Sequence, residues 1–532
     1  MANYRVVFTG KDTNNHVNVC VTDGTSAGTS EVAVFGASTS GLFYGGRSPS
    51  FARFGHRELF AGYDVNGHVN LWVTNGTTPG TSELTPGEGY YGIFNFSRTP
   101  DFTIFGNKVL FAGVDASDHP NLWVTDGTSA GTNELVVAGV SSNGLDPDDF
   151  TVLGSKALFS GVDTSGHRGL WATDGRAAGT SELTVGGANP SGLFDSNGSP
   201  LSPDFTVVGD KVVFDGIDVN GSANLWVTDG TSAGTSQLTF YRGFWPLFQG
   251  GLNPHFTLLG SKLLFEGWDS SGRLNPWITD GTSAGTSELT VARAHAKGLL
   301  YYDNALFSSL TQNPDFTVLG NRVLFQGEDA SADISLWVTD GTGTGTSELT
   351  VAGANSDGLF HHGSVYVAPD ITVLGSKALF AGFDSNGHIN LWVTDGTSGG
   401  TSELTVSGAD PSGLFYNNGA AALDPDFTVV GNKVLFAGYD VNGHVNLWVT
   451  DGTAAGTSEL TATGAYSGGL SPSDFTVFSP LPVSSDFNGD GDSDFIYQNS
   501  SGEAYITWYN GGGSLGNPGL SWHIVSSGDF NN

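Results

Sequence analysis

The fold is decided by Asn446-Leu-Trp-Val-Thr-Asp-Gly-Thr453, a segment of which the 532-residue chain holds nine copies. An apolar, β-branched run that ends in Asp-Gly is typical of a strand followed by a tight reversal. The acidic residue of this segment, once replaced by Asn, stands at Asp23, Asn75, Asp126, Asp174, Asp229, Asp280, Asp340, Asp395 and Asp451. Neighbouring copies are 48 to 60 residues apart. Self-similarity at such a period indicates a propeller, a solenoid or another repeat array.

One repeat unit consists of four short runs that have the character of strands. In the last copy the runs are Asp426–Val430, Lys433–Ala437, Asn446–Thr450 and Ser458–Thr461. All four are rich in β-branched and aromatic residues, and turn-forming residues separate them. None has the period of a helix. Four short antiparallel strands per repeat are the plan of a propeller blade.

The two ends of the repeat region together complete one unit. The first copy starts at Arg5–Gly10, which corresponds to the second run, and Asp474–Phe478 supplies the missing first run after the ninth copy. We therefore predict an all-β fold, a closed β-propeller of nine four-stranded blades over residues 1–478. Pairing of the last strand with the first would leave no open sheet edge. The alternative is an open β-solenoid, which would need polar capping repeats.

The charge and composition exclude several classes of partner. There are 53 acidic and 19 basic residues, which give a formal net charge of −34. Such a charge repels phosphate backbones and anionic membranes, so we expect no nucleic-acid partner. We expect no membrane insertion, because no apolar window is long enough to span a bilayer. Cys20, the single cysteine, occupies the Trp position of the other copies and is expected to be a small buried substitute.

Over residues 4–478 the repeat resembles the bacterial ELWxxDGT repeats, also called hyalin-like repeats. The resemblance is carried by Asn70–Thr74 with Gly80 and Thr81, and by their counterparts in the other copies. This chain departs from the family pattern at the Glu before Leu-Trp, where it has mostly Asn. The resemblance implies an exported bacterial protein, so we expect an extracellular or cell-surface location. A classical signal peptide is not visible at Met1–Tyr4.

After a linker at residues 479–485, the composition changes to the oxygen-rich stretch Asp486-Phe-Asn-Gly-Asp-Gly-Asp-Ser-Asp494. This spacing is typical of a loop that wraps hard oxygen donors around Ca²⁺. The expected ligands are the side chains of Asp486, Asn488, Asp490 and Asp494 and the backbone carbonyl of Asp492. A polar turn with Asx hydrogen bonds is the alternative. Residues 486–532 resemble a partial FG-GAP or VCBS-type repeat.

A second recurring pattern, Asp-x-x-Gly-His-x-Asn, precedes the Trp run in most copies. Its histidines are His16, His68, His119, His167, His388 and His444. Imidazoles at equivalent positions are candidate ligand donors on one face of the ring. The alternative, which we favour, is a structural turn in which Asp caps its own loop and His packs on a neighbour. One His per blade makes a zinc site improbable.

The connections after the fourth run differ among the copies and contain aromatic and basic side chains. Aromatic faces stack on sugar rings, and polar groups beside them can bind sugar hydroxyls. The candidate ligand-binding residues in these connections are Tyr44, Arg47, Arg242, Trp245, Tyr301, Tyr302 and Tyr416. The alternative is that the Gly-Leu-Phe segments found there pack beneath the loops as satellite core.

Repeated sites suit multivalent binding, in which weak contacts add by avidity. We therefore predict a multivalent carbohydrate-binding protein, a lectin or surface adhesin, whose partners are glycans on a cell surface or polysaccharide. A structural scaffold module of an exported surface protein is the alternative, and a polysaccharide-cleaving enzyme a less favoured one. We expect no catalytic residues, because no acid–base pair unique to one copy and no nucleophile motif is visible.

Removal of calcium should loosen the C-terminal segment and leave the propeller folded. The cation would offset the repulsion among Asp486, Asp490 and Asp494, whereas the blades have no comparable loop. Thermal unfolding and limited proteolysis with and without a chelator measure the effect. Collapse of the whole ring on chelation would instead place calcium within the blades.

Overall fold

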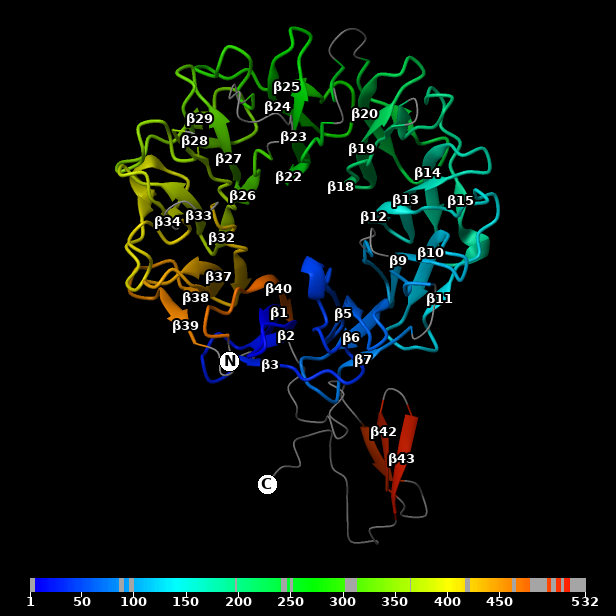
Figure 1. Ribbon diagram of the computed structural model, residues 1–532. Coiled ribbons are helices and arrows are strands. Elements are labelled where there is room, and N and C mark those ends of the chain that lie inside the picture. Colours follow the sequence, from blue (N-terminus) through cyan, green and yellow to red (C-terminus); the bar gives the residue numbers. More distant parts are fainter. Residues whose placement is uncertain are drawn as a thin grey trace. The chain divides into compact units, whose positions relative to one another are not determined.

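The computed structural model (Figure 1) describes residues 5–85, 90–94, 100–196, 199–240, 246–248, 252–301, 313–363, 365–416, 422–461 and 466–478, with the strand backbones at 495–498, 504–508 and 511–516. Its strands form nine antiparallel sheets of four strands each. Helix is confined, among these residues, to three short 3-10 turns at Tyr44–Gly46, Ala177–Gly179 and Ser398–Gly400. The predicted nine-bladed β-propeller is confirmed, and the open solenoid is not favoured.

Blade 9 shows the plan of every blade. Its strands are β36 (Thr428–Val430), β37 (Lys433–Tyr439), β38 (Val445–Thr450) and β39 (Ser458–Leu460), paired in that order. Each predicted run therefore becomes one strand. The short first strand precedes a tight hairpin, and the two long central strands carry most of the apolar side chains.

The other blades repeat this order with similar bounds. The strands are β40 (Ser473–Phe478), β1 (Arg5–Lys11), β2 (Val17–Thr22) and β3 (Ser30–Glu31) in blade 1; β4 (Ala52–Phe54), β5 (Arg57–Tyr63), β6 (Val69–Thr74) and β7 (Ser82–Glu83) in blade 2; β8 (Thr103–Phe105), β9 (Lys108–Val114), β10 (Pro120–Thr125) and β11 (Asn133–Glu134) in blade 3; and β12 (Asp148–Leu153), β13 (Lys156–Val162), β14 (Arg168–Thr173) and β15 (Ser181–Glu182) in blade 4. They continue as β18 (Thr206–Val208), β19 (Lys211–Ile217), β20 (Ala223–Thr228) and β21 (Ser236–Gln237) in blade 5; β22 (Thr257–Leu259), β23 (Lys262–Trp268), β24 (Leu274–Thr279) and β25 (Ser287–Glu288) in blade 6; β26 (Thr317–Leu319), β27 (Arg322–Glu328), β28 (Ile334–Thr339) and β29 (Ser347–Glu348) in blade 7; and β32 (Thr372–Leu374), β33 (Lys377–Phe383), β34 (Ile389–Thr394) and β35 (Ser402–Glu403) in blade 8.

Smaller sheets lie outside the blades. The connections that precede blades 5 and 8 contain two-stranded hairpins, and a three-stranded sheet follows the propeller. Their strands are β16 (Asp195–Ser196), β17 (Ser199–Pro200), β30 (His361–His362), β31 (Val365–Tyr366), β41 (Phe495–Gln498), β42 (Ala504–Trp508) and β43 (Gly511–Gly516). Among the described residues, no helix has the length and apolar character needed to cross a bilayer.

Blade 1 is completed by a strand from the far end of the repeat region, as predicted. β40 pairs antiparallel with β1, and Val6 lies opposite Val477. The rings of Phe8 and Phe475 stack with centroids 5.5 Å apart. The register shifts by one position between Val7 and Thr9. Backbone pairing and apolar contact thus both join the two ends of the repeat region.

The tryptophans of the third strands form the core of the blades. In blade 9, Trp448 stacks on Phe436 with centroids 6.4 Å apart and donates its Nε1–H to the carbonyl oxygen of Gly438. The side chains are at most 6% exposed at Trp72, Trp123, Trp171, Trp226, Trp277, Trp337, Trp392 and Trp448. Cys20 takes the same position in blade 1, is buried as predicted, and has its thiol pKa raised to about 12 by that burial.

Glycine in the second strand lets the loop before each blade pack into this core. A Cβ atom on Gly438 would lie 2.9 Å from Leu414 Cδ1 and 3.0 Å from Trp448 Cδ1, which is closer than real Cβ atoms come. Leu414 and Phe415 are fully buried at this point. The alternative interpretation of the Gly-Leu-Phe segments, as satellite core beneath the loops, is therefore confirmed.

The propeller divides into two compact units, blades 1 and 2 in one and blades 3 to 9 in the other. In the second unit, the blades have two distinct ends. One end carries the turn between second and third strands, such as Asp384–His388, and we call it the His-turn face. The opposite end carries the hairpin at Gly375 and Ser376 and the turn at Asp395 and Gly396, and we call it the Asp-Gly face.

Replacement of Trp226 by Ala should lower the free energy of unfolding by about 3–5 kcal/mol, the usual range for deletion of a core aromatic. The side chain is fully buried and donates to the carbonyl oxygen of Gly216. Calorimetry measures the change. The matched control is Phe35→Ala, whose ring is 82% exposed and whose loss should change stability by no more than about 0.5 kcal/mol. Equal effects of the two substitutions would contradict the assigned core.

Candidate functional site

The six histidines of the recurring pattern lie in the turns between second and third strands, one in each blade concerned. In blade 8, Asp384 Oδ1 accepts the backbone N–H groups of Asn386 and His388 at 2.8 and 2.9 Å. The imidazole Nδ1 lies 3.3–3.8 Å from the Oδ2 atom of the turn Asp at His16, His68, His119, His167, His388 and His444. Each histidine therefore faces its own turn, and the structure does not bring the six together.

The aromatic and basic candidates of the connections contact their own blades. Tyr44 stacks on Tyr63 with centroids 4.0 Å apart, and Arg47 is half-buried. Tyr301 lies edge-on to Trp268 and beneath the ammonium of Lys297, while Tyr416 packs against the core of blades 8 and 9. The residues that lie outside the described part of the chain are Arg242, Trp245 and Tyr302.

The predicted calcium loop, Asp486 to Asp494, also lies outside the described residues. Calcium binding therefore stays a prediction. Elsewhere, within the ranges that the structure describes, no three His, Cys, Asp or Glu side chains converge in a way that could hold a metal ion.

One position of the second strand distinguishes blades 5 to 7 from the rest. It stands between the recurring Phe and Gly and is small in the other six blades, as Thr9, Ala61, Ala112, Ser160, Ala381 and Ala437. In blades 5, 6 and 7 it holds Asp215, Glu266 and Gln326, which we call the polar triplet. These three side chains are at most 1% exposed. Buried acid and amide groups in three consecutive blades need partners or protons, so they mark a candidate site.

Glu266 pairs with a histidine found in no other blade at that position. The register of β22 and β23, in which Thr257 lies opposite Leu264, extends to place His255 across from Glu266. His255 Nδ1 lies 2.5 Å from Glu266 Oε1. Burial raises the pKa of Glu266, and the hydrogen bond with His255 partly offsets that rise. The second carboxylate oxygen, Oε2, is buried and has no hydrogen-bond partner.

Asp215 occupies the equivalent place in blade 5. Its Oδ1 accepts the backbone N–H of Asp204 at 2.9 Å, while Oδ2 is buried without a hydrogen-bond partner. Burial is the main cause that raises the pKa of Asp215 to about 8; the negative charges of Asp204 and Asp149 add to it, against the lowering effect of the Asp204 N–H. The carboxyl group is therefore largely protonated at neutral pH unless a cation approaches.

Gln326 completes the triplet with an uncharged amide. Its Nε2 donates to the carbonyl oxygen of Asn313, and its Oε1 accepts the Tyr366 hydroxyl at 2.6 Å. Tyr366 comes from β31, in the hairpin that precedes blade 8. Both polar atoms of the Gln326 side chain therefore have hydrogen-bond partners, one of them from a neighbouring connection. The carboxylates of blades 5 and 6 each keep one oxygen without a partner.

Five carboxylates stand at or just before the start of the first strands in blades 3, 4, 5, 7 and 8, at the His-turn end of these strands. Their carboxylates accept a hydrogen bond from the next blade at 2.6–3.3 Å, donated by Phe150 N, Ser202 Oγ, Phe256 N, Ile371 N and Phe427 N in turn. We call them the inner-edge acids; they are half-buried and comprise Asp101, Asp149, Asp204, Asp315 and Asp370. Burial raises all five pKa values, to about 7 at Asp149 and Asp370. They join the blades and concentrate negative potential at the same edge.

The sequence interpretation missed the His255–Glu266 pair, since we expected no acid–base pair unique to one copy. A signal was available. Blade 6 replaces the recurring Asp by His and the recurring small residue by Glu, at positions that a hairpin brings opposite each other. The arrangement can hold or exchange a proton, and it can bind a cation through the carboxylates.

Comparisons with known proteins find resemblance in architecture. No family model and no curated protein matches the chain. Among solved structures, a puromycin hydrolase matches with 16% identity and a TM-score of 0.38, over 76% of this chain and 61% of that one. The β-propeller domain of the Trilobed protease from Pyrococcus furiosus matches with 11% identity and a TM-score of 0.30, over 67% of this chain and 94% of that one. The acylaminoacyl peptidase of Pyrococcus horikoshii matches with 10% identity and a TM-score of 0.31, over 76% and 50% of the two chains.

The prediction of a multivalent carbohydrate-binding protein is wrong. The three solved structures named above come from a puromycin hydrolase, a protease and an acylaminoacyl peptidase, and none of the three is a lectin. The loop aromatics described above also contact their own blades. A repeated sequence pattern predicted repeated sites, but what it encodes in the described blades is a repeated set of internal contacts.

Asp215→Asn should flatten the dependence of stability on pH. The folded-state pKa of about 8 lies above the ordinary aspartate pKa of 3.8, so the stability linked to this group is complete below about pH 4 and is lost as pH rises through about 8. The variant should therefore gain stability relative to the wild type between pH 5 and pH 8, as measured by thermal unfolding. Asn keeps an oxygen for the Asp204 N–H. A variant that loses stability at pH 8 would show that the ionised carboxylate is compensated in the folded protein.

Proposed function

We propose that this propeller is a binding module for basic polypeptide segments, whose lysine and arginine side chains it holds at the inner edge of blades 5 to 7. The polar triplet is the observation that carries the proposal. Asp215 and Glu266 each have one buried carboxylate oxygen without a hydrogen-bond partner. Such an oxygen is unfavourable unless the group is protonated or meets a cation, so a bound ammonium or guanidinium group would stabilise it.

The surroundings of the triplet favour a cationic ligand. Asp149, Asp204 and Asp315 lie at the same edge and are half-buried, so solvent reaches them. The formal net charge of −34 adds a long-range attraction for cations and repels nucleic acids. An approaching lysine would be attracted first by these half-buried carboxylates and then by the buried oxygens of Asp215 and Glu266.

The arrangement of the acids favours an extended ligand over a single ion. The inner-edge acids occur once in a blade, and the described side chains provide no convergent metal site. A polypeptide with several basic residues can place successive cations along such a row, and the separate contacts then add. Polyamines share the ammonium chemistry, and the experiment separates them from polypeptides.

We propose binding in preference to catalysis for the His255–Glu266 pair. The pair has the form of a base oriented by a carboxylate, as in enzymes that activate a nucleophile. Within the described residues, however, the imidazole of His255 hydrogen-bonds Glu266 and no hydroxyl or thiol. We therefore assign His255 the role of orienting the Glu266 carboxylate toward a cationic side chain of the ligand.

Fluorescence anisotropy with a labelled oligolysine peptide tests the proposal. We expect saturable binding that weakens as salt rises, because part of the attraction is screened. Asp204→Asn with Glu266→Gln should weaken affinity about tenfold or more, since hydrogen bonds to charged groups contribute roughly 1.5–3 kcal/mol each. Both substitutions keep the acceptor oxygens that the neighbouring groups use.

The matched control is the pair Asp229→Asn and Asp395→Asn. It removes the same number of charges from exposed positions on the Asp-Gly face, so it separates a local site from the effect of net charge. The control should bind like the wild type. Equal loss in both double variants would reduce the effect to overall charge and contradict the site. Spermidine that competes fully with the peptide would identify a polyamine site instead.

A further inference from the structure

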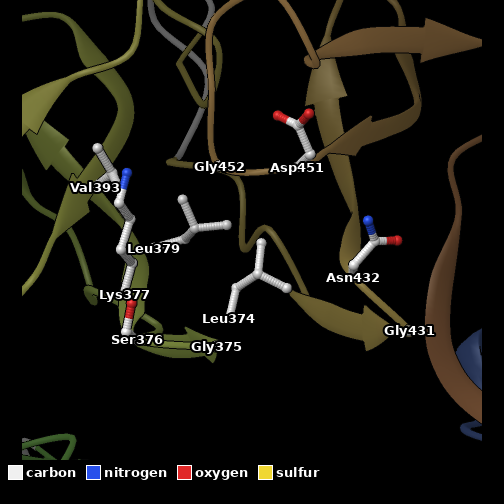
Figure 2. A pocket seen from close by; sticks show the side chains of 10 residues that line it. All are labelled: Leu374, Gly375, Ser376, Lys377, Leu379, Val393, Gly431, Asn432, Asp451 and Gly452. Atoms are coloured by element: carbon white, nitrogen blue, oxygen red, sulfur yellow. The ribbon is translucent and has the colours of Figure 1, made fainter.

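We infer that the groove between blades 8 and 9 on the Asp-Gly face binds short aliphatic peptides in their zwitterionic form. This is a second site, with a ligand class different from that of the inner edge. The groove has a volume of about 490 Å³, within the range of about 300–1,000 Å³ common for ligand sites. Figure 2 shows Leu374 and Leu379 in its middle, Lys377 and Val393 on one side, and Asn432 and Asp451 on the other.

Among the described residues, no cation bridges the two blades across this groove, whereas a cation does so between two other pairs of blades. Between blades 4 and 5, Lys156 Nζ donates to the carbonyl oxygen of Gly230 at 2.8 Å. Arg322 reaches the carbonyl oxygen of Gly396 in the same way between blades 7 and 8, at 3.5 Å. The equivalent residue, Lys377, makes no hydrogen bond to Gly452 or to any other residue in the described part of the chain.

Lys377 carries its positive charge close to the Asp-Gly turn of its own blade. The pKa of Asp395 is lowered chiefly by the hydrogen bond from Thr397, and the positive charge of Lys377 lowers it further. Lys377 is exposed, so its ammonium can reach a ligand at the mouth of the groove. A carboxylate is the group that this ammonium would bind.

The opposite wall offers the complementary charge. Asp451 Oδ1 accepts the backbone N–H and the hydroxyl of Thr453 at 3.0 and 2.6 Å. The other oxygen, Oδ2, takes no hydrogen bond from the residues that the structure describes. It would accept the ammonium group of a ligand whose carboxylate meets Lys377 across the groove.

The apolar middle of the groove selects the side chain. A Cβ atom on Gly452 would lie 3.6 Å from Leu374 Cδ2, so the leucine side chain lies close against the bare backbone of blade 9. Leu374 is half-buried, while Leu379 and Val393, which also line the groove, are buried beside it. An aliphatic side chain placed between the two charges would cover this surface and be removed from water.

Isothermal titration of the full chain with the dipeptide Leu-Leu and its blocked forms tests the inference. We expect saturable binding of Leu-Leu, and about fivefold weaker binding when the N-terminus is acetylated or the C-terminus is amidated, the gain from one exposed ion pair. The peptide blocked at both ends should bind weakest. Failure of Leu-Leu to bind saturably, or equal binding of all four peptides, would overturn the inference.

Two substitutions assign the contacts. Lys377→Met should weaken the binding of Leu-Leu about fivefold and leave the binding of the amidated peptide unchanged. Asp451→Asn should also weaken the binding of Leu-Leu about fivefold, and it should leave the binding of the acetylated peptide unchanged. Blade 2 has Asn75 at the position of Asp451 with the same hydrogen bonds to Thr77, so the Asn variant keeps the turn. The matched control, Asp229→Asn, lies beside the groove that Lys156 bridges and should have no effect.

Substitutions in one of the two sites should leave binding at the other site unchanged. Asp204→Asn with Glu266→Gln should leave Leu-Leu binding unchanged, and Lys377→Met should leave oligolysine binding unchanged. Loss of Leu-Leu binding in the inner-edge double variant would contradict a separate groove site. Because the blocked peptides test both charged contacts on the unaltered protein, the inference can be refuted even if a variant does not fold.

Discussion

The contact between a loop leucine, a strand glycine and a strand tryptophan is the constraint on which the propeller depends. Leu193 from the connection before blade 5 would lie 3.0 Å from a Cβ atom on Gly216, and Trp226 would be equally near. Any side chain at this glycine would separate the connection from the blade. The same glycine carbonyl accepts the Trp226 Nε1–H, so one residue sets both the approach of the loop and the orientation of the ring. Each blade thereby fixes the path of the connection that leads into it.

The sequence was sufficient to predict the blades, because their determinants are local. The run before Asp451 alternates in the manner of a strand, and Asp-Gly provides the reversal, so strand positions follow from short-range chemistry. The closure of blade 1 by β40 also followed, because the missing run could be identified at the other end of the repeats. Burial of Trp448 and its equivalents followed from their place in apolar strands.

The candidate site was harder to predict, for a physical reason. Asp215 and Glu266 stand in strands that otherwise hold apolar side chains, and their roles depend on whether Oδ2 and Oε2 find partners. That question is answered by three-dimensional packing and not by residue type. The pairing of His255 with Glu266 could be predicted from the register of the hairpin. The prediction would have required a search for positions at which one copy of the repeat differs from the others. The groove beside Lys377 is formed by side chains of two neighbouring blades, and the sequence pattern does not show how closely these side chains pack.

The circular shift of strands has a consequence for how the protein is made. Thr9 bonds Ser473 across 464 residues of sequence, so blade 1 cannot be completed until almost the whole propeller has left the ribosome. At a synthesis rate of roughly 5–20 residues per second, the edge of β1 waits about 20 to 90 seconds for its partner. During that interval the nascent chain exposes an unpaired strand edge, which could pair with a strand of another nascent chain. The long-range pairing that completes blade 1 therefore leaves the chain most exposed to misassembly while it is being synthesised.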